Sequence, residues 1–218
     1  MDYGNMVGDS FAYAKEAVVG KWNKWVMLII ATILLGLPLM GYALKVLRGD
    51  KPAPEVEDWG TLFIDGIKYL IVAIIWMLPV YIVLGILMVI GFGAAMTGDE
   101  SAAMAGIGIM IIGMIIVAIL AIIIALFMMI GVVRSARTGS IGEAFNFSAI
   151  RSTIAKIGWV PYIIALIVLM VCGAIFSIVM GILMMIPILG WLLYFCMIPP
   201  YMLFISRYIC QLYDSAGA

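Results

Sequence analysis

Four long apolar stretches dominate the chain, and short polar clusters separate them. None of the four contains Asp, Glu, Lys, Arg or His, and each meets or approaches the length of about 20 residues that a helix needs to cross the hydrocarbon core of a bilayer. The pattern therefore predicts an all-α fold, a polytopic integral membrane helical bundle. The four predicted spans are Tyr69–Met96, Met104–Val133, Ile157–Ile186 and Gly190–Ser206.

A fifth apolar run, Trp25–Leu44, has the length of a span but carries helix-disturbing residues at its middle. Gly36 and Pro38 lie at its centre and Gly41 follows; proline removes a backbone donor, and glycine permits unusual dihedral angles. We expect a re-entrant hairpin over residues 25–47 that bends at these three residues; the alternative is an ordinary first span with a proline kink. In the hairpin, protein must cover the backbone freed at the bend, because lipid cannot satisfy it.

The charged residues lie outside the predicted spans and predict the topology. The segment Thr97–Ala103 carries only Asp99 and Glu100, whereas all the Lys and Arg residues lie in the other polar segments. Cytoplasmic loops carry an excess of Lys and Arg, so we expect a multi-pass protein of the cytoplasmic membrane with most of its basic residues in the cytoplasm. All twelve Lys and Arg residues fall on one side only if Trp25–Leu44 turns back.

Two shorter segments combine an apolar stripe with basic residues elsewhere, which is typical of helices that lie in the membrane interface. The alternative is that these segments are cytoplasmic extensions of the spanning helices. Ser140 and Glu143 have the spacing of a capping box, which would begin the second of these helices. The stripes are Phe11, Ala14, Val18, Trp22 and Trp25 in the first segment, and Phe147, Ile150, Ile154 and Ile157 in the second.

The organisation that follows is a single membrane domain over residues 1–218. We expect an interfacial helix at 1–24, the re-entrant hairpin or first span at 25–47, and helical hairpins at 58–137 and 140–210. A repeated pattern, in which an amphipathic segment leads into an apolar hairpin that ends in a basic stretch, agrees with this division.

The composition agrees with a lipid environment and argues against several classes of function. Of the 218 residues, 67% are hydrophobic and 11% are charged, against about 25% charged residues in soluble domains. The chain has no His, its three Cys form no close pair, and no catalytic motif occurs, so we expect no enzyme activity, no metal and no cofactor. The predicted spans lack the ionisable groups that proton-coupled transport uses. A net charge of zero gives no reason to expect nucleic-acid binding.

Small residues on the third predicted span are one candidate for function. Gly173, Ser177 and Gly181 recur at a spacing of four and so share one helix face. Such a face lets helices approach closely in a membrane. We expect it to pack inside one subunit; the alternative is self-association.

Prolines interrupt two of the predicted spans and are the other candidates. Pro79 is followed by Tyr81, and Pro199 and Pro200 are consecutive. Each proline removes a backbone donor and leaves an earlier carbonyl without its helical partner, and broken helices can expose backbone oxygens to a solute or ion. These residues form a candidate helix-break or solute site; the alternative is a static kink that shapes packing.

Short segments spread over most of the chain carry a resemblance to a known family. They are Gly41–Gly49, Trp59–Lys68, Met77–Pro79, Phe145–Ile150, and Ile157–Trp159 followed by Tyr162. In these segments the chain is similar to an uncharacterised family of polytopic membrane proteins that is frequent in archaea. The resemblance implies a prokaryotic, archaeal cytoplasmic membrane and supplies no catalytic residues.

The leading functional hypothesis is a non-enzymatic integral membrane scaffold or accessory subunit. It would act through helix packing and through association with a partner or with itself, and it rests on the absent reactive groups, the small-residue face and the amphipathic segments. The alternatives are a channel or carrier for a neutral or apolar solute, and a membrane-shaping protein. The expected partners are membrane lipid and either a second copy of the chain or another membrane protein.

Overall fold

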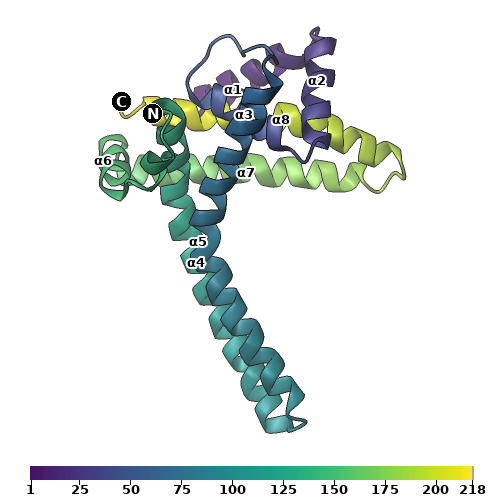
Figure 1. Ribbon diagram of the computed structural model, residues 1–218, viewed down its shortest axis with the longest axis vertical. Helices are drawn as coiled ribbons and strands as arrows, with labels where there is room; N and C mark the ends of the chain where they lie inside the picture. Colours follow the sequence, from purple (N-terminus) through teal and green to yellow (C-terminus); the bar gives the residue numbers. More distant parts are fainter. Residues whose placement is uncertain (218) are drawn as a thin grey trace. The chain divides into compact units, whose positions relative to one another are not determined.

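A computed structural model describes residues 1–217 of the chain, and within them every regular element is a helix (Figure 1). Eight α-helices and one short 3-10 helix follow one another with brief connections. Their bounds are α1 Tyr3–Val18, α2 Trp22–Ile33, α3 Leu37–Leu47, α4 Trp59–Met96, α5 Glu100–Thr138, the 3-10 helix Ile141–Phe145, α6 Phe147–Ile157, α7 Trp159–Leu183 and α8 Leu189–Asp214.

Four of these helices, α4, α5, α7 and α8, are long and apolar enough to cross a membrane. They coincide with the four predicted spans, so the predicted fold class is confirmed. The 38 residues of α4 extend over roughly 57 Å at about 1.5 Å per residue, which is nearly twice the hydrocarbon thickness of a bilayer. Because α4 begins at Trp59 and not at Tyr69, the polar segment before the predicted span is an extension of the spanning helix.

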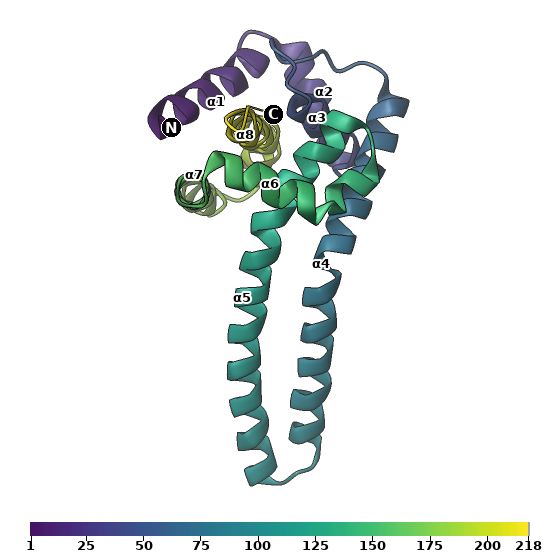
Figure 2. The same cartoon turned by 90° about the vertical axis from the view of Figure 1, so that its left-hand side faces the viewer.

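The helices divide into two compact units. Unit 2 is the segment Ile71–Met129, the apolar part of the α4–α5 hairpin, in which the two helices run side by side (Figure 2). Close contacts at small residues hold the pair together: Gly113 lies against the Leu87 side chain, and Gly106 lies against Ala94. Most of the large side chains of unit 2 point outward and are exposed, which is the arrangement expected of a hairpin surrounded by lipid.

Unit 1 comprises Met1–Leu70 and the chain from Ile130 onward. Within it, α1, α2, α3 and α7 all pack on α8, and Figure 2 looks nearly along α7 and α8 with α1 lying across α8. The buried core of this unit joins the first three helices, the linker after them, the first part of α4 and α8. Its members are Tyr13, Ala14, Ala17, Val18, Leu28, Ala31, Leu39, Tyr42, Val46, Ala53, Val56, Leu62 and Leu203.

Two helix boundaries differ from the sequence expectations. The first predicted stripe is divided between α1 and α2, because the chain breaks at Gly20, whose φ of 78° is left-handed. The second stripe is a separate helix, α6, that ends at Gly158 with φ of 92°. The predicted capping box is not formed: Asn146 caps α6 by accepting a hydrogen bond from the Ala149 N–H at 3.1 Å.

Glu143 instead joins the 3-10 helix to α5. Its carboxylate accepts hydrogen bonds from the Arg134 guanidinium and, at 3.2 Å, from the Asn146 side chain. The hydrogen bond from Arg134 is the main cause that lowers the pKa of Glu143, with Asn146 adding to it. The residue predicted to begin a helix thus serves as the acid of an ion pair.

The run from Trp25 to Leu47 is a helix–turn–helix and not a single kinked helix. The turn lies at Leu34–Gly36, where Gly36 has a φ of 70°. Pro38 lies in the first turn of α3. A backbone N–H there has no helical carbonyl to bond, so the proline costs no helical hydrogen bond. At 12 and 11 residues, α2 and α3 are each too short to cross a bilayer, which takes about 20 residues.

The linker after α3 is held by three buried or half-buried polar side chains. Each donates a hydrogen bond to a linker carbonyl, which satisfies backbone that has no helix to join. Burial lowers the pKa of Lys24, an effect that its partner Glu55 opposes, and burial raises the pKa of Tyr42. The bonds are Tyr13 to Asp50 at 3.0 Å, Lys24 to Ala53 at 2.7 Å and Tyr42 to Pro54 at 2.6 Å.

Gly41 lies inside α3, away from the turn, where it permits close contact with the first part of α4. A Cβ at Gly41 would overlap the Leu62 carbonyl, and a Cβ at Gly66 would overlap the Leu37 carbonyl. The two glycines therefore bring the backbones of α3 and α4 together from both sides. The role of Gly41 is in packing, and the bend depends on Gly36.

We predict that Gly41→Ala and Gly66→Ala each destabilise the protein by about 1–3 kcal/mol, because backbone must move to admit the new methyl group. Gly60→Ala, in the first turn of α4 with open space around its α-carbon, is the matched control and should be neutral. Thermal unfolding of the purified variants in detergent measures the difference. Equal melting temperatures for all three variants would contradict the packing role.

Candidate functional site

The consecutive prolines of α8 leave the helix continuous but remove two backbone donors. The N–H of residue 200 would ordinarily donate to the carbonyl of Cys196, and Pro200 has none. The indole N–H of Trp25, from α2, donates to that carbonyl at 2.9 Å. The side chain of another helix thus replaces the missing helical hydrogen bond, and the carbonyl is no longer without a donor.

An apolar groove of about 520 Å³ runs beside Pro200; we call it the Tyr201 groove. Helices α1, α7 and α8 line it, together with the first turn of α2. Its lining residues are Val7, Phe11, Ala14, Lys15, Val18, Val19, Trp25, Cys172, Ile175, Phe176, Val179, Met197, Pro200, Tyr201 and Phe204.

Two aromatic side chains form the wall between α7 and α8. The rings of Phe176 and Tyr201 are stacked with centroids 3.9 Å apart and planes 2° from parallel. Gly173 makes room for this stack, because a Cβ there would lie 2.9 Å from the Tyr201 hydroxyl oxygen. The Tyr201 hydroxyl therefore packs against α7.

The first wall of the groove, α1, is fastened to α8 by polar contacts. The Gln211 amide donates to the Ser10 hydroxyl at 2.8 Å, and the buried Arg207 guanidinium donates to Asp9 at 3.1 Å. Arg207 also lies over the Tyr13 ring, 5.5 Å from its centroid. Burial raises the pKa of Tyr13, although the charge of Arg207 acts in the opposite direction. These contacts hold α1, one wall of the groove, against α8.

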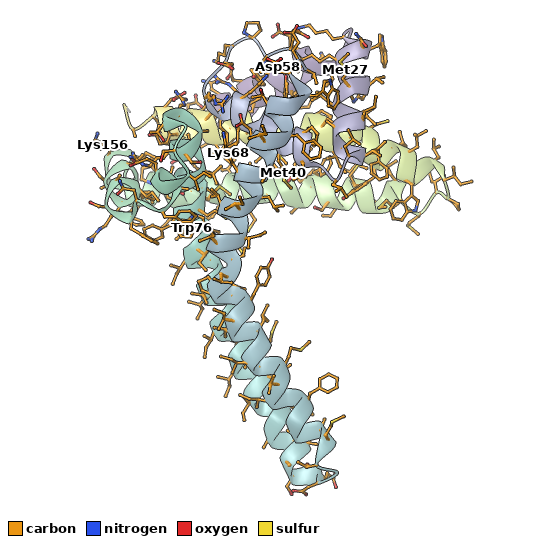
Figure 3. All side chains as sticks on the ribbon, viewed as in Figure 1. Met27, Met40, Asp58, Lys68, Trp76 and Lys156 are labelled. Atoms are coloured by element: carbon orange, nitrogen blue, oxygen red, sulfur yellow. The ribbon has the colours of Figure 1, made fainter. Side chains whose placement is uncertain are left out.

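The polar contact between α1 and α8 could not be predicted from the sequence. Asp9 and Arg207 are 198 positions apart, so neither spacing nor periodicity relates them. The one signal was that Arg207 directly follows a long apolar run. Asp65 is a buried acid, paired with Arg48 at 2.7 Å and with Lys68 at 2.9 Å; Figure 3 labels Lys68 on the first part of α4.

The structure separates the candidate helix-break residues. Pro200 and Tyr201 line the groove, and the buried Pro199 does not. Pro79 and Tyr81 belong to unit 2, where both side chains are exposed on α4.

The small-residue face of α7 is also divided. Gly173 packs against α8 through Tyr201, whereas Ser177 and Gly181 are exposed, and a Cβ at Gly181 would meet nothing within 4 Å. Packing inside the chain therefore accounts for the first of the three small residues and leaves the other two uncovered.

Acidic and sulfur side chains are scattered over the described part of the chain. Among residues 1–217 no three His, Cys, Asp or Glu side chains gather as they would around a metal ion. The three cysteines are free thiols, and Cys172 lines the groove.

An all-helical chain with four helices of membrane-spanning length is a polytopic membrane protein in its architecture. The family model described as "Protein of unknown function (DUF4013)" matches residues 25–205, so the chain belongs to that family. The matched region contains most of the α2–α3 hairpin and most of α8, including the hydrogen bond between Trp25 and Cys196. No curated protein and no solved structure matches the chain.

We predict that Trp25→Phe destabilises the protein by about 1–3 kcal/mol, because it leaves the Cys196 carbonyl without a donor while keeping an aromatic ring. The loss should shrink when Pro200→Ala is also present, since the backbone N–H at position 200 then supplies the donor. A double-mutant cycle of thermal unfolding measures this coupling. Trp191→Phe, at an exposed position of α8, is the control; additive effects in the cycle would show that the hydrogen bond is not what matters.

Proposed function

We propose that this protein is a non-enzymatic integral membrane scaffold or accessory subunit that acts through helix packing. The observation that carries the proposal is the uncovered part of the α7 face. Ser177 and Gly181 stand one helical turn apart on a helix of membrane-spanning length, and both are exposed. Small residues at this spacing let a second helix approach closely in lipid, where van der Waals packing drives association.

The distribution of charge supports an orientation in the membrane. All twelve Lys and Arg residues lie outside the segment Ile71–Met129, whose only charged residues are Asp99 and Glu100 at the turn of the hairpin. By the positive-inside rule the basic ends face the cytoplasm. The cytoplasmic membrane is thus part of the proposal, as is the archaeal setting that the family resemblance implies.

The geometry lends less support to the two alternative functions. At the proline break the Cys196 carbonyl already accepts a hydrogen bond from Trp25, so it is a poorer ligand for a solute than a carbonyl without a donor. The Tyr201 groove is lined by apolar side chains, so among solutes it suits an apolar molecule. For membrane shaping, α1 and α6 would have to insert apolar faces into the bilayer, yet Ala14, Val18, Ile150 and Ile154 of their stripes are buried in the chain.

The orientation predicts which positions can be labelled from outside an intact cell. In a cysteine-free background, Thr97→Cys should react with an impermeant maleimide from outside, and Gly8→Cys should react only after the membrane is opened. Both positions are exposed in the structure, so accessibility depends on the side of the membrane. Labelling of both from outside would overturn the orientation.

The scaffold proposal predicts that bulk at the α7 face disrupts association. Ser177→Leu combined with Gly181→Leu should weaken self-association or partner binding by about tenfold or more. Gly85→Leu, on α4 with open space around it, is the control for added bulk. Subunit counting by single-molecule photobleaching, with co-purification from gently solubilised membranes, provides the measurement. A monomer that brings down no other protein would overturn the proposal.

A further inference from the structure

We propose that the Tyr201 groove binds one hydrocarbon chain of an anionic membrane phospholipid, whose phosphate pairs with Lys15. This inference goes beyond the scaffold role and does not use the Ser177 and Gly181 face. It rests on the chemistry of the lining, on where the groove opens and on the single cation beside it.

The lining selects a hydrocarbon. Of the fifteen residues that line the groove, Lys15 is the only charged one. Burying a polar group without a hydrogen bond costs roughly 2–7 kcal/mol of free energy. A polar solute that enters the groove would therefore lose more free energy of hydration than it gains from contact with the apolar lining. The volume of about 520 Å³ lies inside the range of about 300–1,000 Å³ that is usual for small-molecule sites.

The groove follows the helix axis and opens onto an apolar surface. Met197, Pro200, Tyr201 and Phe204 fall at successive turns of one α8 face, so the hollow is elongated and suits an extended chain. On its rim Phe11 is 64% exposed, which leaves an apolar ring at the opening. Two of the walls, α7 and α8, are candidate membrane spans, so the occupant can enter sideways from the bilayer.

Lys15 supplies the charge that a phosphate requires. It is exposed, it is the one cation among the residues that line the groove, and within residues 1–217 it forms no ion pair. Lysine lays its methylene stem along apolar surface and keeps the ammonium in the polar layer. A lipid headgroup occupies that layer when its chain lies in the groove beneath.

The test is native mass spectrometry of the full chain, delipidated in detergent and titrated with defined lipids. The probes are phosphatidylglycerol and a diacylglycerol with the same chains. We expect one phosphatidylglycerol retained per chain. Lys15→Gln should weaken that binding about fivefold, which corresponds to about 1 kcal/mol per lysine at an anionic lipid. Binding of the diacylglycerol should not change, because it has no phosphate.

A second variant tests the groove itself. Ile175→Trp adds bulk at the exposed rim without touching the core, and it should weaken binding of both lipids by tenfold or more. The controls are Lys156→Gln on α6 and Ile167→Trp on α7, which are exposed residues outside the groove.

Three results would overturn the proposal. One is an unselective series of lipid adducts that none of the four variants changes, and another is equal loss of binding in the test and control variants. The third is a dimer that Ile175→Trp abolishes while no lipid is retained, because a second copy of the chain would then be the occupant. Failure of the Ser177 and Gly181 experiment would leave the lipid result unaffected, so the two proposals can be judged separately.

Discussion

The hydrogen bond from the Trp25 indole to the Cys196 carbonyl satisfies a backbone group of α8 that would otherwise lack a partner. Backbone groups in a membrane must be satisfied by protein, since hydrocarbon offers neither donors nor acceptors. Pro200 leaves one carbonyl of α8 without its donor, and α2 provides the replacement at 2.9 Å. Each helix of the α2–α3 hairpin is too short to cross a bilayer, and the hairpin supplies the donor that Pro200 removes from α8.

The remaining packing of unit 1 follows from holding the first three helices against α8. Asp9 and Ser10 bind the end of α8, and side chains from α1, α2 and α3 tie down the linker. Gly41 and Gly66 let α3 approach α4 at backbone distance. The Tyr201 groove is a consequence of this arrangement: α1 and α7 both pack on α8 and line the groove with it, and the stack of Phe176 on Tyr201 forms the wall between α7 and α8.

The long helices could be predicted from the sequence, whereas their ends and the short helices were predicted less well. A charge-free run of twenty or more residues leaves the chain almost no alternative to a helix in lipid. Ser140 and Glu143 show the opposite case, because a capping box and an ion pair use the same residue types, and Arg134 decided between them. Gly41 was predicted at a bend but lies at a close contact between helices. Glycine is common in both places, and sequence spacing does not distinguish them.

The sequence by itself determined the all-helical class, the four apolar helices and the segregation of basic residues, because these depend on local composition and on the bilayer as solvent. It also identified Pro200 as a place where a carbonyl loses its donor. Only the tertiary structure decided what satisfies that carbonyl, which small residues of α7 stay uncovered, and that Lys15 stands unpaired beside an apolar groove. Those outcomes depend on contacts between residues as far apart in the sequence as Trp25 and Cys196. Contacts over such separations produce no periodic pattern from which they could be predicted.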